Sequence, residues 1–402
     1  MSAQPRSARR SSSRSARLSA VLATALALLC LTSLVACTQA ERVSEDLGAR
    51  AYTGRFYADA PSTPQKPGTL VRSETAVGAP RGSTAWRILF WSTDLHGAPV
   101  LNSGMLVVPD APAPAGGRTV VSWGHPTTGT AEKCAPSRSV DPYVWMEGLP
   151  ELLGQGYAVV ATDYTGMGVP GPDSYLIGDT AGRNLLDAVR AARSLPRTDL
   201  GSKVLLWGHS QGGQAALFAA QLWKAYAPEL DVRAVAVAAP ATDLAPLLRA
   251  DIGDISGVSI ASYAFAAYSS VYGAPVESIL TPAAARALPA INGFCLITQN
   301  DALHAVARPL VGTFLTADPA TTQPWQDLLA ANTPGSVRLP IPLLVAQGLS
   351  DQLVRPDLTK AFVDRELRLG TAVTYDTVPG ATHGTIVGKA LPRVLAFFAA
   401  VG

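Results

Sequence analysis

The sequence contains little charge, few cysteines and none of the short motifs that commonly bind metals or phosphates. Charged residues make up 15% of the 402 residues, against roughly 25% in an average globular chain. Because 48% of the residues are hydrophobic, the composition excludes a disordered protein, which needs low hydrophobicity and high net charge. The chain has no CxxC pair, no HExxH motif and no Walker-type phosphate loop. We therefore expect neither a metal site nor a cofactor.

The N-terminus has the pattern of an export signal. Residues 1–17 carry five arginines and no acidic residue, and residues 18–36 form one uncharged apolar run. A basic segment followed by an apolar one is typical of export. Without residues 1–36 the chain has 27 basic and 30 acidic residues, a net charge of −3. Such a chain lacks the basic surface that binds nucleic acid, so we expect an exported protein that does not bind it.

The apolar run ends at a candidate lipidation site. The segment LVAC at 34–37 resembles the bacterial lipobox, whose cysteine carries a diacylglycerol group and becomes the mature N-terminus. Two acyl chains hold a protein at a membrane, since each buried CH₂ contributes about 0.8 kcal/mol. We expect Cys37 to be lipidated and to anchor the protein to a membrane of the cell envelope. Plain cleavage with secretion, or an uncleaved anchor, are the alternatives.

Two cysteines remain when Cys30 leaves with the signal and Cys37 carries lipid. They are Cys134 and Cys295. Exported chains fold where disulfides persist, so a remaining pair favours one bridge. Two unpaired buried thiols are the alternative.

The rest of the chain alternates apolar strands with helices. Two β-rich runs at 84–93 and 102–108 indicate a hairpin. Further strands are expected at 119–123, 157–162, 203–207, 233–238, 342–347 and 372–378, and helices at 180–195, 211–226, 357–369 and 385–401, with an amphipathic segment at 144–153. Near-continuous apolar strands between helices predict an α/β fold, with a mostly parallel sheet covered on both faces. Ligands of such folds bind beyond the C-terminal ends of the strands.

One long segment interrupts this alternation and divides the chain. The signal (1–36) is followed by a proline-containing tether and irregular N-terminal segment (37–80), and the core comprises residues 81–242 and 340–402. Residues 243–339 lie between two strands and are too many for a structureless loop. We expect a mostly helical insertion that acts as a lid or cap and supplies an apolar substrate site. A purely structural subdomain is the alternative.

A candidate nucleophile lies in the strand-to-helix turn at 208–212. The turn reads GHSQG and therefore matches G-x-S-x-G, with the strand 203–207 running into it and the helix 211–226 leaving it. A nucleophile elbow requires this context. A serine hydroxyl attacks a carbonyl only when a neighbouring base takes its proton. We predict Ser210 as the nucleophile.

The base and the acid that would activate Ser210 are expected at two other strand ends. His383 follows the last strand and gives the chain order Ser, acid, His. Asp351 follows the strand 342–347 and is the expected acid that orients the imidazole. Asp243, which also follows a strand, is the alternative. His209 is expected to point away from Ser210 and to act in packing.

An oxyanion formed during acyl transfer needs two hydrogen-bond donors. One is the backbone N–H of Gln211, the residue after the nucleophile. The other is expected in the loop that follows the strand 119–123. Because Pro126 has no N–H, Thr127 is the candidate there, through its backbone or its hydroxyl.

Four motifs, taken in order, resemble the secretory lipases of the α/β-hydrolase superfamily, the lipase A type. They are DYTGMG at 163–168, GHSQGG at 208–213, GLSD at 348–351 and ATHG at 381–384. The resemblance covers residues 60–402. It implies hydrolysis of carboxylic esters, including acylglycerols, through an acyl-enzyme beneath a helical lid. A peptidase or an acyltransferase with the same triad, and a non-catalytic lipoprotein that binds apolar ligands, are the alternatives.

Overall fold

The computed structural model describes residues 54–58, 61 and 63–401. The expected export signal and the lipidation of Cys37 lie outside these residues and stay predictions. Among the described helices, none is both long and apolar enough to cross a membrane.

A single nine-stranded sheet organises the fold, in the order β1-β2-β3-β5-β4-β6-β7-β8-β9. The strands are β1 Leu70–Ala76, β2 Ser83–Thr93, β3 Pro99–Pro109, β4 Arg118–Gly124, β5 Ala158–Thr162, β6 Leu200–His209, β7 Asp231–Ala238, β8 Leu343–Gly348 and β9 Val373–Val378. The first three strands pair antiparallel, and β3 pairs antiparallel with β5. All the remaining pairs are parallel. The expected hairpin and the mostly parallel α/β sheet are confirmed.

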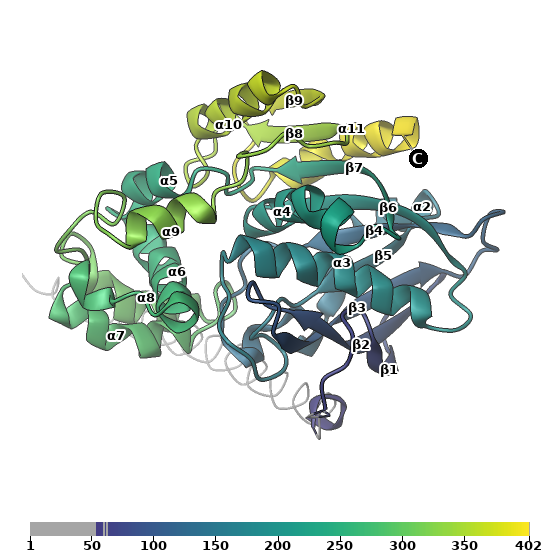
Figure 1. The fold of residues 1–402 in the computed structure, drawn as a ribbon, viewed down its shortest axis with the longest axis horizontal. Coiled ribbons are helices and arrows are strands. Elements are labelled where there is room, and N and C mark those ends of the chain that lie inside the picture. Colours follow the sequence, from purple (N-terminus) through teal and green to yellow (C-terminus); the bar gives the residue numbers. More distant parts are fainter. Residues whose placement is uncertain (1–53, 59–60, 62, 402) are drawn as a thin grey trace, which may run out of the picture. The chain divides into compact units, whose positions relative to one another are not determined.

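Helices cover both faces of the sheet (Figure 1). One face packs against α3 Gly178–Ser194, α4 Gln211–Tyr226 and α10 Pro356–Leu369. The other packs against α2 Leu149–Gly154 and α11 Ile386–Val401. Strand β6 illustrates why the strands of this sheet are apolar along their whole length. Its Val204 packs in the hydrophobic core on one face of the sheet, and its Trp207 packs in the core on the other face. Successive side chains of a strand point to opposite faces of the sheet. In a sheet covered by helices on both faces, side chains of either orientation must therefore be apolar.

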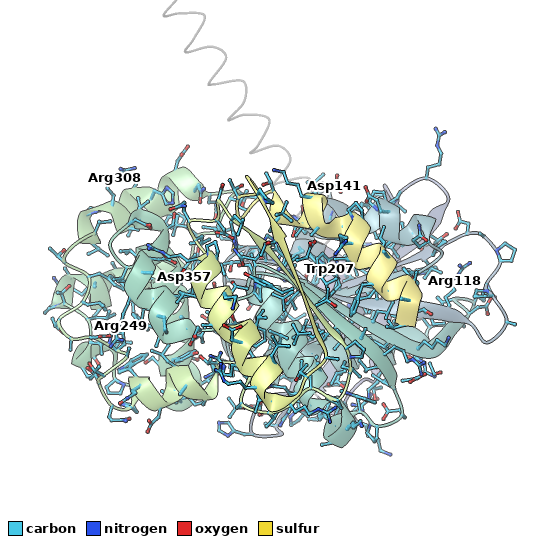
Figure 2. The ribbon with its side chains drawn as sticks, turned by 90° about the horizontal axis from the view of Figure 1, so that it is seen from above. Arg118, Asp141, Trp207, Arg249, Arg308 and Asp357 are labelled. Carbon is cyan, nitrogen blue, oxygen red and sulfur yellow. A yellow bond between two sulfur atoms is a disulfide. The ribbon has the colours of Figure 1, made fainter. Side chains whose placement is uncertain are left out.

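Five helices follow β7 and precede β8, in the segment expected to be a helical insertion. They are α5 Leu244–Asp251, α6 Ile255–Tyr272, α7 Pro282–Asn292, α8 Asn300–Ala307 and α9 Trp325–Ala331. They gather beside the sheet (Figure 1), and Figure 2 shows Arg249 and Arg308 on this part of the molecule, away from Trp207. Tyr263 and Phe265 of α6 are buried in the same core as the sheet. The insertion's role as a lid stays a prediction.

A disulfide joins the insertion to the core. Cys134, in the loop after β4, is bonded to Cys295, which follows α7 and lies 161 residues further along the chain. The expected bridge is confirmed, and both cysteines are 7% exposed.

Three local expectations differ from the structure. The segment expected to be irregular contains strand β1 at its end, where β2 provides the pairing partner. Helix α3 begins at Gly178, two residues before the expected start at 180. The amphipathic segment 144–153 is divided between a short 3-10 turn and α2, because Gly148 adopts a left-handed conformation with φ of 83°.

Candidate active site

Ser210 lies in a strained turn between β6 and α4. Its φ is 57° and its ψ is −118°, a conformation that costs a non-glycine residue about 1–3 kcal/mol. Glycines make the turn possible: a Cβ on Gly208 would collide with the carbonyl oxygen of Gly212, and a Cβ on Gly212 with that of Gly124. The sequence therefore folds here into the tight strand–turn–helix connection that a nucleophile elbow requires.

His383 is hydrogen-bonded to Asp351. The two side chains lie beyond the C-terminal ends of β9 and β8, and Nδ1 is 2.8 Å from Oδ2. The other oxygen of Asp351 accepts from the N–H groups of Leu353 and Val354, each at 2.9 Å. A carboxylate only accepts hydrogen bonds, so Nδ1 donates and Nε2 is left as the basic nitrogen. The alternative acid, Asp243, forms an ion pair with Arg365 at 3.4 Å.

The ring of His383 lies beside the elbow. Its centroid is 4.8 Å from that of His209, the residue before Ser210. Ser210 forms hydrogen bonds to other described residues only through its backbone, which leaves its hydroxyl available. Catalytic hydrogen bonds are often long in the free enzyme and tighten when substrate binds. The fold thus brings the His383–Asp351 pair next to the turn that carries Ser210.

His209 has a closer relation to the site than packing. Its Nδ1 lies 2.7 Å from Oε2 of Glu147, and its ring contacts the ring of His383. His209 is 3% exposed, so the Glu147–His209 pair packs against the His383 ring inside the protein. Sequence reasoning missed Glu147 because it belongs to no motif and lies 62 residues from His209.

A pocket of about 720 Å³, including its open mouth, adjoins Ser210. Both expected oxyanion donors line it: Gln211, the first residue of α4, and Thr127, whose hydroxyl is 2.7 Å from that of Tyr175. The first N–H groups of a helix have no partner inside it, so the Gln211 N–H is free to bind an anion. The insertion supplies much of the remaining wall, which is mostly apolar: Leu244, Leu247, Leu248, Ile260, Ala261, Ala264, Phe265, Tyr268 and Leu329.

Burial shifts the pKa values of several titratable groups near the site, among them His125 and Asp251. Burial lowers the pKa of His125, which favours the neutral ring, and its Nδ1 is 2.7 Å from the carbonyl oxygen of Pro126. Burial raises the pKa of Asp251 in the pocket wall to about 7. In the part of the chain that the structure describes, no three His, Cys, Asp or Glu side chains are placed to hold a metal ion.

Comparison with known proteins identifies the family. The family model "Secretory lipase" matches residues 146–398, a range that includes Ser210, Asp351 and His383. A probable inactive lipase of Mycobacterium tuberculosis is 26% identical, over 82% of this chain and 77% of its own. Lipase A of Moesziomyces aphidis is 23% identical, over 88% of this chain and 82% of its own.

Solved structures show the same fold. The crystal structure of Candida antarctica lipase A in its closed state superimposes with a TM-score of 0.69 at 20% identity, covering 84% of this chain and 82% of that one. The fold is therefore that of the α/β-hydrolase lipases, and the chain belongs to the secretory lipase family.

Proposed function

We propose that this lipase-family protein is an exported serine hydrolase that cleaves carboxylic esters, acylglycerols or other lipid esters, through an acyl-enzyme. The observation that carries the proposal is the position of Ser210, in a strained elbow on the wall of a mostly apolar pocket, with the His383–Asp351 pair packed against His209 of that elbow. An apolar wall suits an acyl chain, since each buried CH₂ contributes about 0.8 kcal/mol.

The proposed reaction transfers an acyl group twice. Ser210 Oγ attacks the ester carbonyl carbon as its proton passes to Nε2 of His383, and the carbonyl oxygen becomes an oxyanion. The Gln211 N–H and Thr127 bind that oxyanion. When it collapses, the bond to the alcohol breaks and His383 protonates the leaving oxygen. Asp351 accepts from Nδ1 throughout and stabilises the imidazolium ion.

Water completes the cycle. His383 takes a proton from a water molecule, whose oxygen attacks the acyl-enzyme and forms a second oxyanion. Collapse of this intermediate breaks the bond to Oγ, which recovers its proton from His383, and the free acid leaves. No external reductant, oxidant or metal is required by this sequence of steps.

A labelling experiment tests the nucleophile. Ser210→Ala is expected to reduce turnover of para-nitrophenyl esters by a factor on the order of 10⁶. The wild type is expected to be labelled by a fluorophosphonate, and the variant is not. Substantial ester hydrolysis by Ser210→Ala would show that Ser210 is not the nucleophile. Amide substrates and alcohol acceptors in the same assay distinguish an esterase from a peptidase and from an acyltransferase.

A second candidate is a catalytically inert protein that binds apolar ligands in the same pocket. One observation favours this candidate: a relative of this chain is named a probable inactive lipase. This candidate predicts that Ser210 stays unlabelled while the pocket still binds a fluorescent fatty acid.

The place of action is proposed to be the cell envelope, with the protein anchored through a lipid on Cys37. The pattern at 34–37 supports this proposal. Cys37→Ala is expected to move the protein from the detergent phase to the aqueous phase in a phase-partition experiment, because two acyl chains provide the anchor. Unchanged partitioning would favour the uncleaved apolar segment as the anchor.

A further inference from the structure

One acidic side chain lies in the wall of the otherwise mostly apolar pocket. Asp251 is the last residue of α5, it lines the same pocket as Ser210, and only 9% of it is exposed. Its neighbours in that wall include Leu247, Leu248 and Val354. A carboxyl group among hydrocarbon side chains is unfavourable unless something provides it with a hydrogen bond.

The protein itself does not provide that bond. Oδ1 of Asp251 is buried without a hydrogen-bond partner in the described part of the chain. Arg355 forms an ion pair with Asp251, but its Nε lies 3.8 Å from Oδ1, beyond hydrogen-bond distance. The guanidinium of Arg355 instead donates to the backbone oxygen of Ala250 at 2.9 Å. Buried polar groups in native proteins nearly always form hydrogen bonds, so a carboxyl oxygen that has only a 3.8 Å ion pair in a pocket wall calls for an explanation.

The surroundings of Asp251 favour its neutral, protonated form. Burial raises the pKa of Asp251 to about 7, the charges of Asp254 and Asp351 act in the same direction, and Arg355 opposes them. A neutral carboxyl donates one hydrogen bond and accepts others, which is the complement of an alcohol. An ammonium group fits less well, because Arg355 already provides a positive charge there and a second cation would have to lose its water.

We propose that Asp251 forms a polar subsite in the acyl pocket that binds a hydroxyl group carried on the acyl chain. The preferred substrates are then esters of hydroxylated fatty acids, whose hydrocarbon contacts the apolar wall while the hydroxyl group pairs with Asp251. This proposal rests on the proposed ester hydrolysis at Ser210, and it assigns Asp251 to specificity and not to the chemical step.

The test compares matched pairs of para-nitrophenyl esters. Each pair consists of a straight-chain acyl ester and its counterpart with a terminal hydroxyl, in a series from butanoate to hexadecanoate that places the hydroxyl at successive depths. In the wild type, the ratio of kcat/KM for the hydroxylated ester to that for the plain ester is expected to peak at one chain length. One hydrogen bond to an otherwise unpaired group gives a peak of about tenfold.

Three variants separate a specificity role from a structural one. Asp251→Leu is expected to remove the peak while it still hydrolyses plain esters, and Asp251→Asn is expected to retain the peak, since an amide also donates and accepts. Asp254→Asn is the charge control, because it retains the helix cap to Gly257 but removes a charge that raises the pKa of Asp251. The peak should remain in this variant, since an ionised carboxyl still accepts a hydrogen bond from a hydroxyl. If Asp251→Leu does not fold, Asp251→Ala is measured in its place.

The outcomes are distinguishable. A peak that is lost in Asp251→Leu and retained in both asparagine variants supports the subsite. Hydrolysis of plain esters with the same ratio in the wild type and in Asp251→Leu, at every chain length, overturns the subsite but leaves the proposed function standing. Absence of turnover for every ester, with Ser210 unlabelled by fluorophosphonate, overturns both.

Discussion

Removal of the Cys134–Cys295 disulfide is expected to destabilise this protein strongly. The bridge closes a loop of 161 residues that contains the whole Ser210 elbow. A cross-link restricts the unfolded chain more strongly when the loop is longer. The bridge also connects the loop that carries Thr127 to the helical insertion, and the hydroxyl of Thr128 donates to the backbone oxygen of Cys134 at 3.0 Å.

The expected magnitude follows from the loop length. The chain-entropy relation for this separation gives about 5 kcal/mol at 25 °C. That is a large part of the 5–15 kcal/mol by which native proteins are typically stable. Because either substitution alone opens the loop, Cys134→Ala, Cys295→Ala and the double variant should all lose nearly the same free energy of unfolding.

Urea unfolding followed by tryptophan fluorescence measures this loss. The midpoint is expected to fall by roughly 1–2 M in all three variants, and the wild type in excess reductant should match them. Midpoints that remain at the wild-type value would refute the cross-link argument. Losses from the two single variants that add up to the loss of the double variant would also refute it, since independent packing effects add and a shared bond does not.

Three further predictions concern the site and its surroundings. Asp351→Asn should lower the turnover of a model ester by about 10⁴-fold without unfolding the protein, because an amide no longer holds the Nδ1–H tautomer; initial rates and circular dichroism together test this. Gly212→Ala should lower stability by about 1–3 kcal/mol, because its Cβ meets the carbonyl oxygen of Gly124, whereas Gly388→Ala, in an open part of α11, should slightly raise the thermal midpoint. Burial raises the pKa of Asp173 to about 7, whereas its value in the unfolded chain is about 3.9. The folded state therefore binds more protons than the unfolded state between these pH values. As a result, the free energy of unfolding falls as the pH rises from about 4 to 7. Asp173→Asn should therefore raise the urea midpoint at pH 8 relative to the wild type more than at pH 4, and an effect independent of pH would contradict this reasoning.

Local patterns are enough to predict the regular elements of the core and the order of the chemical motifs. The strand that leads to Ser210 and the helix that leaves it are recognised from adjacent residues, and helix α4 has the bounds that its periodicity predicts. The apolar strands predict the parallel sheet because a strand buried on both faces must be apolar at every position. The edge strand β1 is missed, since most of its residues are only partly buried and its pairing depends on β2.

The contacts between distant segments depend on the tertiary structure. Asp351 and Asp243 each follow a strand and are equivalent as local patterns, yet only Asp351 bonds His383, while Asp243 pairs with Arg365. No pattern in the sequence predicts the contact of His209 with Glu147. The burial of Asp251 in the pocket wall is likewise not predicted by any local pattern.

The physical reason is the range of the forces involved. Backbone geometry and the alternation of apolar residues act over a few neighbours and can be read along the chain. The partner of a side chain depends on how helices and strands pack in three dimensions. Only that packing determines which carboxyl meets the imidazole and which lacks a hydrogen bond in the pocket wall.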